Sequence, residues 1–303
     1  KPINIVEAIL SEDKEEAQGI GLLLTKEKQL VPVYYSAARI GDVDNILGIA
    51  MLFKDISSER EIDKMKSNFV SIVSHQFRTP LTAIKWTLEM LLSGDAGEIN
   101  EEQKQLLGDV LKSNRRLVKL VAELLNVSHL ESGKVGVQVK KTSLRPIIAK
   151  VVRDQLVAAR HRNINIVFDQ KDIPDVYTDP VLFENVLENI ISNAVDYTPS
   201  EGGDKNIIIS AKSNQKNVVI SVQDHGIGIP KGEKNRIFSM FFRSEGAIQL
   251  RANGTGLGLF IAKMMTEMTG GKIWFESEKG KGTTFFISFP REKKHIHQRQ
   301  LMK

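Results

Sequence analysis

The chain has 303 residues, of which 41% are hydrophobic and 26% charged, and this size and composition predict two or three globular domains. It contains no cysteine, which excludes disulfides, thiol nucleophiles and thiolate metal sites, and its six histidines are scattered rather than clustered as metal ligands. The net charge of +5 is mild, and we expect the basic tail at 292–303 to be a solvated end rather than a nucleic-acid-binding patch.

No membrane span is predicted, because the sequence has no run of about 18 apolar residues. No signal peptide is visible in the sequence either. The chain begins with Lys1 rather than methionine, so we expect a piece of a longer protein. We expect this portion to be cytoplasmic. An anchor in the inner or plasma membrane stays open for the full-length protein, through a segment absent from this chain.

Residues 1–56 are predicted to form a small β-rich region. A helical segment at 5–17 precedes three apolar or alternating runs that are typical of strands: GLLLT, LVPVYYSAARI and ILGIAMLFKDI. Turns at 26–28 and 41–44 separate these runs. The region is too small to form a deep core of its own.

The pattern then changes to the period of a helix, which we expect over residues 57–93. The three-four spacing of a coiled coil is followed by Ile62, Met65, Phe69, Ile72 and Gln76. Pro80 should bend or loosen this helix, because proline removes one N–H group and crowds the preceding turn.

A second long helix is predicted after a break at 94–97. Asn100 should cap its start, with Gln103 completing a capping box, and Gly133 should end it. Two antiparallel helices cannot bury both apolar faces alone. We therefore favour a homodimer with a four-helix bundle, with packing against another domain of the chain as the alternative.

His75 stands within the first helix, in the run FVSIVSHQFRTPLT, with Thr79 one turn further on the same side. A histidine beside an apolar helix face is more often structural than reactive. This run alone therefore does not establish chemistry.

From residue 134 onward the sequence predicts a two-layer α/β sandwich. Helices are expected at 143–159, 179–197 and 256–268. The expected strands are VGVQVK, INIVFD, NIIISA, NVVISVQD, GKIWFES and TTFFISF.

Three clusters in this part suggest a nucleotide site. Asn189 and Asn193 lie four residues apart on a helix, and an amide oxygen suits Mg²⁺, although two asparagines are a weak signal. Asp224 opens the glycine-containing run DHGIGIP directly after a strand. The run GTGLGL at 254–259 opens a helix whose N–H groups could bind an anion.

The stretch between these glycine runs, residues 231–253, is long, charged and poorly periodic, as in loops that cover a ligand. Its phenylalanines should anchor it, and Arg243 is a candidate phosphate ligand. A tight turn at 280–285 leads into the last strand.

Five motifs in this order resemble the sensor histidine kinases of two-component signalling, over residues 56–290. SHQFRTP resembles the phospho-acceptor box, NIISNAVDYTP the N box, DHGIGIP and GTGLGL the two glycine boxes, and RIFSMFFR the phenylalanine box. The resemblance implies three regions before the tail: a partial PAS-like region at 1–56, a dimeric phosphotransfer hairpin of HisKA type at 57–133, and an ATP-binding domain of HATPase_c type at 134–291, shared with DNA gyrase and MutL.

The resemblance also implies roles for single residues. His75 would take the γ-phosphoryl group of ATP and pass it to an aspartate of a response regulator, and Thr79 would position the water that dephosphorylates that regulator. Asn193 would bind Mg²⁺, and Asp224 would read adenine. The implied ATP-binding residues are Asn189, Asn193, Asp196, Tyr197, Asp224, Gly226, Gly228, Ile229, Gly254, Thr255, Gly256, Leu257, Gly258, Leu259 and Thr283.

Two positions depart from the family pattern. Gln76 replaces an acidic residue that acts as a base or orients the imidazole, and an amide cannot take a proton. Asp196 stands where a lysine is common, and a carboxylate there repels ATP unless a cation offsets it. The cations considered for this purpose are Arg78, Lys231, Lys234 and Arg243.

The leading interpretation is an ATP-dependent protein-histidine kinase. The alternative is an ATP-binding signalling scaffold or phosphatase-biased protein with weak kinase activity, which Gln76 and Asp196 would favour. An ATP-driven machine of the gyrase type is disfavoured, because such proteins lack the SHQFRTP helix and usually carry a glutamate at the position of Asn189.

Overall fold

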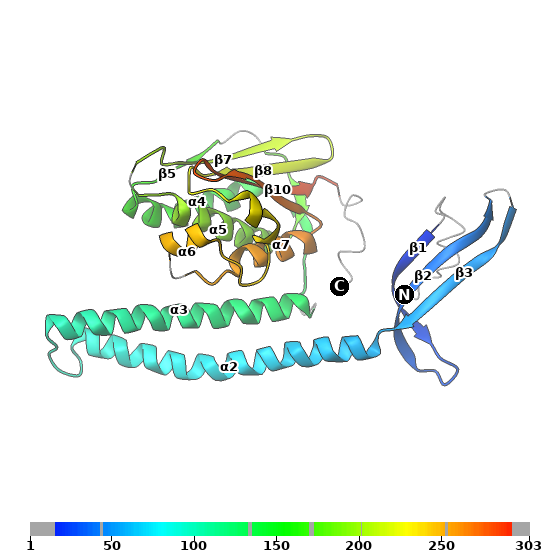
Figure 1. Ribbon diagram of the computed structural model, residues 1–303, viewed down its shortest axis with the longest axis horizontal. Coiled ribbons are helices and arrows are strands. Elements are labelled where there is room, and N and C mark those ends of the chain that lie inside the picture. The colour runs from blue at the N-terminus through cyan, green and yellow to red at the C-terminus, as the bar shows by residue number, and fades with distance from the viewer. Residues whose placement is uncertain are drawn as a thin grey trace. The chain divides into compact units, whose positions relative to one another are not determined.

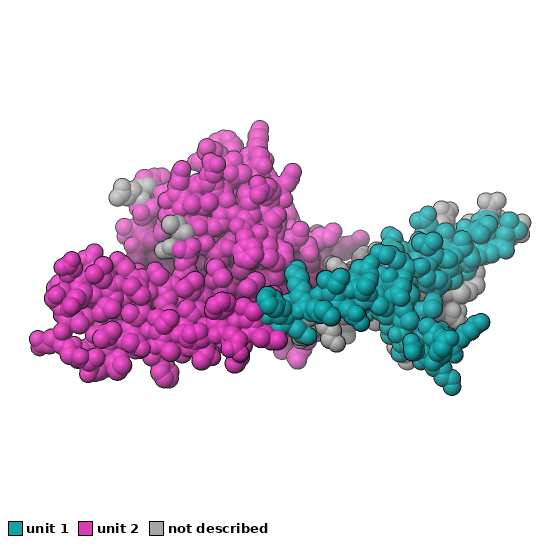
Figure 2. All heavy atoms as spheres, turned by 60° about the horizontal axis from the view of Figure 1, so that its bottom comes forward, with its two compact units in different colours: residues 1–69 teal, residues 70–303 magenta. Residues whose placement is uncertain are grey.

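The computed structural model divides into two compact units, residues 1–69 and 70–303 (Figure 2). Within the described helices, none is both long enough and apolar enough to cross a membrane. The residues that the structure describes are 16–42, 45–132, 135–169, 173–200, 202–251 and 254–292.

The first unit contains a three-stranded antiparallel sheet in the order β1-β2-β3 (Figure 1). The strands are β1 (Glu16–Leu24), β2 (Leu30–Asp42) and β3 (Asn45–Asp55), as the three apolar runs predicted. The helix predicted at 5–17 lies outside the described residues except at its end, where the prediction is wrong. Glu16 and Ala17 pair with Ala38 and Ala37 as part of β1, because the neighbouring strand supplies a complete ladder.

Helix α2 (Ser57–Ser93) follows β3 directly and confirms the predicted long helix. The Asp55 side chain accepts a hydrogen bond from the Ser57 N–H at 2.8 Å. Hydrogen bonding to the Ser57 side chain, and then to this N–H, lowers the pKa of the Asp55 carboxyl. The helix continues through Pro80. Proline has no N–H group for the carbonyl of Gln76, whereas the carbonyl of Arg78 accepts from the Thr82 hydroxyl at 2.8 Å.

Helix α3 (Glu101–Glu131) begins with the predicted capping box. Asn100 accepts from the Gln103 N–H at 2.8 Å, and the Gln103 side chain accepts from the Asn100 N–H at 2.9 Å. One copy of the α2–α3 hairpin leaves several large apolar side chains exposed. They include Phe69, Ile72, Phe77, Trp86, Met90, Leu106, Val110 and Leu117.

The α/β region after the hairpin has a five-stranded sheet in the order β5-β7-β8-β10-β9, with only β5 and β7 parallel among these pairs. Helices α4, α5 and α7 cover one face of it (Figure 1). Strands β4 and β6 form a separate pair. The bounds are β4 (Lys140–Thr142), α4 (Leu144–His161), β5 (Asn165–Phe168), β6 (Val176–Thr178), α5 (Pro180–Tyr197), β7 (Asn206–Ser213), β8 (Asn217–Gln223), the 3-10 helix η1 (Lys231–Arg236), α6 (Glu245–Leu250), α7 (Gly258–Met268), β9 (Lys272–Glu278) and β10 (Gly282–Pro290).

Two predictions for this region need correction. The strand VGVQVK is wrong except at its last residue, because the Gln138 N–H donates to the Asp179 carboxylate at 2.7 Å instead of joining a ladder. The segment 231–253 is not structureless, since it contains η1 and α6, which are too short to show a helical period in the sequence.

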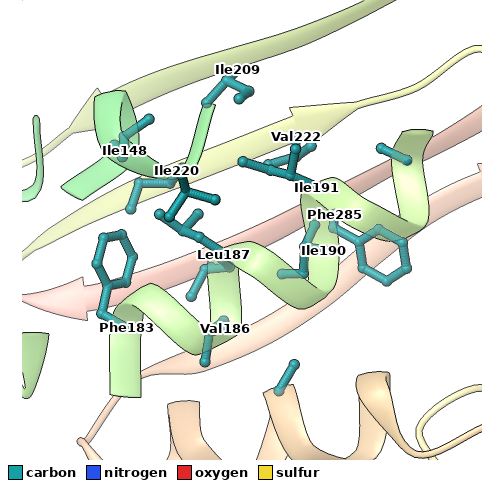
Figure 3. Close-up of a cluster of buried hydrophobic side chains, with 14 of the residues drawn as sticks. Ile148, Phe183, Val186, Leu187, Ile190, Ile191, Ile209, Ile220, Val222 and Phe285 are labelled. Carbon is teal, nitrogen blue, oxygen red and sulfur yellow. The ribbon is translucent and has the colours of Figure 1, made fainter. Parts of the chain in front are cut away.

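Helix α5 lies across the sheet and buries one side in the core (Figure 3). Asp179 caps its start by accepting from the N–H groups of Val181 at 2.9 Å and Leu182 at 3.2 Å, and Pro180 occupies the first helical position. The buried side comprises Leu182, Phe183, Val186, Leu187, Ile190, Ile191, Ala194 and Val195. The polar residues of the N box are therefore left on the other side of the helix.

Replacing Leu187 with alanine should lower the free energy of unfolding of the α/β region by about 2–5 kcal/mol, because removing a fully buried side chain leaves a cavity. Val181→Ala on the same helix is the matched control. Its side chain is 65% exposed, and its loss should cost less than about 0.5 kcal/mol. Urea unfolding measures both variants, and equal losses would contradict the packing described here.

Candidate functional site

A cavity of about 410 Å³ lies where α5, the loop after β8, the segment leading into α7 and strand β10 meet. Gly226 and Leu257 lie outside its lining, since Gly226 packs against the Tyr197 carbonyl and Leu257 is fully buried in the core. The other ATP-binding residues proposed from the sequence line the cavity, namely Asn189, Asn193, Asp196, Tyr197, Asp224, Gly228, Ile229, Gly254, Thr255, Gly256, Gly258, Leu259 and Thr283.

Asp224 is a buried carboxylate in the wall of this cavity, with 6% of its surface exposed. Its Oδ1 accepts hydrogen bonds from the N–H groups of Gly226 at 2.8 Å and Thr283 at 3.1 Å. Burial raises the pKa of the Asp224 carboxyl to about 6, although these N–H groups and His225 act in the opposite direction. The carboxylate is thus ionised at neutral pH, and both bonds end on Oδ1, which leaves Oδ2 as the acceptor for a ligand.

Ser277 joins the loop after β8 to the turn between β9 and β10. Its hydroxyl accepts from the Ile229 N–H at 2.8 Å and lies 2.9 Å from the Gly282 carbonyl and 2.8 Å from the Thr283 hydroxyl. Gly228, with a φ of 62°, lies so close to the turn that a Cβ would be 2.0 Å from the Glu278 carbonyl oxygen. Only glycine fits this approach, which holds Asp224 and Thr283 at a fixed separation.

The two asparagines of α5 line the cavity from one side. The Asn189 amide nitrogen donates to the Asn185 carbonyl at 2.8 Å. Its Oδ1 would lie 2.7 Å from a Cβ added to Gly258, so this glycine allows α7 to begin against the amide oxygen. The two amide side chains therefore offer neutral oxygens, which fit a Mg²⁺ ion that is otherwise held by water and phosphates.

Arg243 lines the cavity, and its guanidinium is engaged with the main chain around α6. It donates to the carbonyls of Gly254 at 3.3 Å, Ala247 at 3.0 Å and Arg251. The role as phosphate ligand that we expected from the sequence therefore competes with a structural role in holding this segment.

Asp196 also lines the cavity, where its carboxylate forms an ion pair with the guanidinium of Arg251. Sequence reasoning missed Arg251, because it immediately follows α6 in a stretch without periodicity. Its pKa is lowered by burial and by the nearby charge of Arg162. Arg162 itself donates to the backbone carbonyls of Asp196 at 3.2 Å and Thr198 at 3.1 Å.

Helix α3 contributes a basic edge to the cavity that sequence reasoning also missed. The signal was present as four basic residues within two helical turns. The lining residues from α3 are Lys112, Arg115, Arg116, Lys119 and Glu123. Arg115 additionally pairs with Glu89 of α2 at 2.9 Å, within the hairpin.

The phospho-acceptor residues that we expected lie together on α2. His75, Gln76, Arg78 and Thr79 are all exposed on this helix, and none of them lines the cavity. The structure thus separates the histidine from the cavity, and a reaction between them requires the two to be brought together.

Two family models match the chain. Residues 65–133 match the His Kinase A (phospho-acceptor) domain, and residues 178–293 match the histidine kinase-, DNA gyrase B- and HSP90-like ATPases. The first match includes His75. The second includes every ATP-binding residue proposed from the sequence.

Curated relatives match over most of this chain. Sensor histidine kinase WalK of Bacillus subtilis is 33% identical over 254 residues, which cover 82% of this chain and 40% of WalK. Sensor protein SrrB of Staphylococcus aureus is 33% identical over 244 residues, which cover 80% of this chain and 41% of SrrB. The chain therefore spans about two fifths of the length of these relatives.

Solved structures share the fold. Full-length ShkA in complex with AMPPNP has a TM-score of 0.61 and 23% identity, covering 74% of this chain and 45% of its own. The Acinetobacter baumannii histidine kinase AdeS has a TM-score of 0.52 and 21% identity, covering 72% of this chain and 98% of its own.

The two domain matches occur in the order that the motifs indicated, with the phospho-acceptor hairpin before the ATPase-like domain. The exposed histidine lies in the first and the cavity with the buried carboxylate lies mainly in the second. With these matches and its similarity to WalK and SrrB, the chain belongs to the sensor histidine kinases of two-component signalling.

Proposed function

We propose that this chain uses ATP to phosphorylate His75 and then passes the phosphoryl group to an aspartate of a response-regulator receiver domain. The observation that carries the proposal is the convergence of a buried carboxylate, two asparagines and a glycine-rich helix start on one cavity. These groups can hold a base at one end and a polyphosphate at the other. A phospho-acceptor domain lies in the same chain.

The adenine end is assigned to Asp224. Its ionised Oδ2 accepts a hydrogen bond from the exocyclic amine of adenine, a group that only an acceptor can recognise. Thr283 approaches the base from the turn that Ser277 fastens, and Tyr197 packs near it. This arrangement supports specificity for adenine over bases that present a carbonyl oxygen at the same place.

The phosphate end is assigned to the oxygens of Asn193, supported by Asn189. These residues would hold Mg²⁺, which when bound neutralises charge on the phosphates. The N–H groups at the start of α7, opened by Gly256 and Gly258, suit the phosphate oxygens. The chain positions the nucleotide and offsets its charge, as phosphoryl transfer requires.

The transfer step forms one bond and breaks another. A ring nitrogen of His75 attacks the γ-phosphorus, the bond from that phosphorus to the β–γ bridging oxygen breaks, and ADP leaves. The imidazole loses its N–H proton to solvent, and Gln76 can orient the ring by hydrogen bonding without accepting that proton. The phosphoramidate then passes its phosphoryl group to the regulator, and Thr79 positions water for the reverse signal, dephosphorylation of that regulator.

The assembly that we propose is a homodimer. Its four-helix bundle would cover apolar side chains on α2 and α3 that one copy leaves exposed. We assign the three-stranded sheet before α2 to a partial PAS domain. Because the reaction consumes ATP, we place this portion in the cytoplasm.

A second candidate function is that of a phosphatase-biased or scaffolding protein, which binds ATP but transfers its γ-phosphoryl group slowly. The presence of Gln76 where a base is common favours it, because a positioned base contributes about 10²–10⁴-fold to rate. The rate of autophosphorylation in a Gln76→Glu variant, described below, separates the two functions.

Incubation with Mg-ATP labelled on the γ-phosphate should label the protein with phosphate that is acid-labile and alkali-stable, as expected of a phosphohistidine. His75→Gln should abolish the label. His161→Gln, at an exposed histidine that ends α4, is the matched control and should retain it. Label that survives in the His75 variant would contradict the assignment.

Adenosine binding should weaken as the pH falls through about 6, because burial raises the pKa of Asp224 to that value. Protonation then turns the charged acceptor into a neutral carboxyl group with an O–H donor. Adenosine carries no phosphate, so its own charge does not change over this range. The expected loss between pH 7.5 and pH 5.5 is about fourfold. Asp224→Asn should bind more weakly at every pH and show no such slope, and an unchanged slope in this variant would assign the titration to another group.

Gln76→Glu should raise the rate of autophosphorylation at least about tenfold, because it supplies a base beside His75. Gln105→Glu adds the same charge at an exposed position of α3 and is the control. The initial rate of acid-labile labelling measures both. No increase in the Gln76 variant, together with tight ATP binding, would favour the phosphatase-biased function.

A further inference from the structure

Helix α5 places a negative charge at the end of the cavity where ATP would add several more. Asp196 follows Asn193 by three residues on the same helix, so the two side chains are neighbours. Its carboxylate is only 22% exposed, and a partly buried carboxylate repels phosphate more strongly than a solvated one does. ATP binding at this end of the cavity is therefore favoured by a cation that offsets the carboxylate.

The cations proposed from the sequence do not do so. Lys231, Lys234 and Arg78 are not among the described residues that line the cavity, and Lys234 donates to the Ser277 carbonyl. Arg243 lines the cavity but donates to three main-chain carbonyls. Three of the four basic lining residues of α3, namely Lys112, Arg115 and Lys119, pair with acids of the hairpin itself.

Arg251 lines the cavity and pairs with a side chain of the N-box helix, whereas Arg162 donates to backbone carbonyls at the end of that helix and does not line the cavity. Nη1 of Arg251 pairs with Oδ2 of Asp196, and both residues line the cavity. The main chain around Arg251 is held in turn, because its carbonyl accepts from Arg243 and its N–H donates to the Ala247 carbonyl at 3.1 Å. Both the main chain and the guanidinium of Arg251 are therefore held in place.

The guanidinium keeps donors for a second anion. Arginine has five N–H groups arranged to meet two oxygens at once. The ion pair uses Nη1, whereas Nη2 and Nε form no hydrogen bond with the described residues. The side chain of Arg251 is 40% exposed, so a phosphate can reach it.

We propose that Asp196 is a positioning residue that holds Arg251 at the phosphate end of the cavity, where Arg251 takes the place of the lysine common at position 196. The positive charge comes from the residue after α6 instead of from α5. The carboxylate that would otherwise repel ATP orients the cation that attracts it. The proposal rests on the proposed function, since it names a further residue of the same ATP site.

The test is a double-mutant cycle of Asp196→Asn and Arg251→Gln, read by the affinities for Mg-ATP and for adenosine. Arg251→Gln should weaken Mg-ATP at least about tenfold and leave adenosine unchanged, because the guanidinium acts only on phosphate. Asp196→Asn should also weaken Mg-ATP, although it removes a negative charge. The double variant should be no weaker than Arg251→Gln alone, because both changes disable one cation.

A transplanted charge provides the second measurement. Asp196→Lys in the Arg251→Gln background returns the cation to α5 and should restore most of the lost Mg-ATP affinity. Glu184→Gln is the matched control, because Glu184 also lies on α5 in an ion pair, with Lys150, but does not line the cavity. It should change neither affinity, and thermal melting checks that each variant is folded.

The outcomes separate this proposal from the proposed function. Tighter Mg-ATP binding by Asp196→Asn would show simple repulsion and overturn the positioning role alone. Equal loss of adenosine and Mg-ATP in Arg251→Gln would show a structural role and overturn it too. An unaltered chain that binds neither ligand would overturn the proposed function and this proposal with it.

Discussion

The site depends on helix α5, which has the hydrophobic core on one side and the cavity on the other. The helix lies beside α4 and α7 on one face of the sheet (Figure 1), and its apolar side packs into the core (Figure 3), with side chains such as Phe183 and Leu187 almost fully enclosed. Its other side is left to Asn189, Asn193 and Asp196 at the cavity. Because the buried side fixes the rotation of the helix about its axis, the direction of the polar groups is set by the packing of the core.

The opposite wall of the cavity relies on close contact between main chains. Gly228 and Gly282 allow two loops to touch where any side chain would collide, and the hydroxyl of Ser277 bridges them. Asp224 is trapped between these loops at the cost of solvation, which the two N–H groups on its Oδ1 partly offset. An acceptor held in this way does not reorganise when a ligand arrives, which is the property that selective recognition of a base needs.

The sequence predicted those parts of the molecule that local patterns determine. The capping box of Asn100 and Gln103 marked the start of α3. The four-residue spacing of Asn189 and Asn193 placed both asparagines on one side of α5. The parts that failed depend on distant partners. Gln138 was predicted in a strand, but its N–H donates to the distant Asp179. Arg251 was given no role, because its partner Asp196 is also distant in the sequence. No local pattern in the sequence reports which of its charges will meet in space.

The end of α3 packs into the hydrophobic core of the α/β region. Val127 and Leu130 are buried in the same core cluster as Leu144 and Ile148, and Gln138 is bonded to the cap of α5. Separating this attachment would expose two aliphatic side chains, at roughly 1.5–3 kcal/mol each. A movement that brings the cavity to His75 by breaking this attachment therefore costs free energy, so we expect the attached arrangement to be favoured until another contact compensates for the loss.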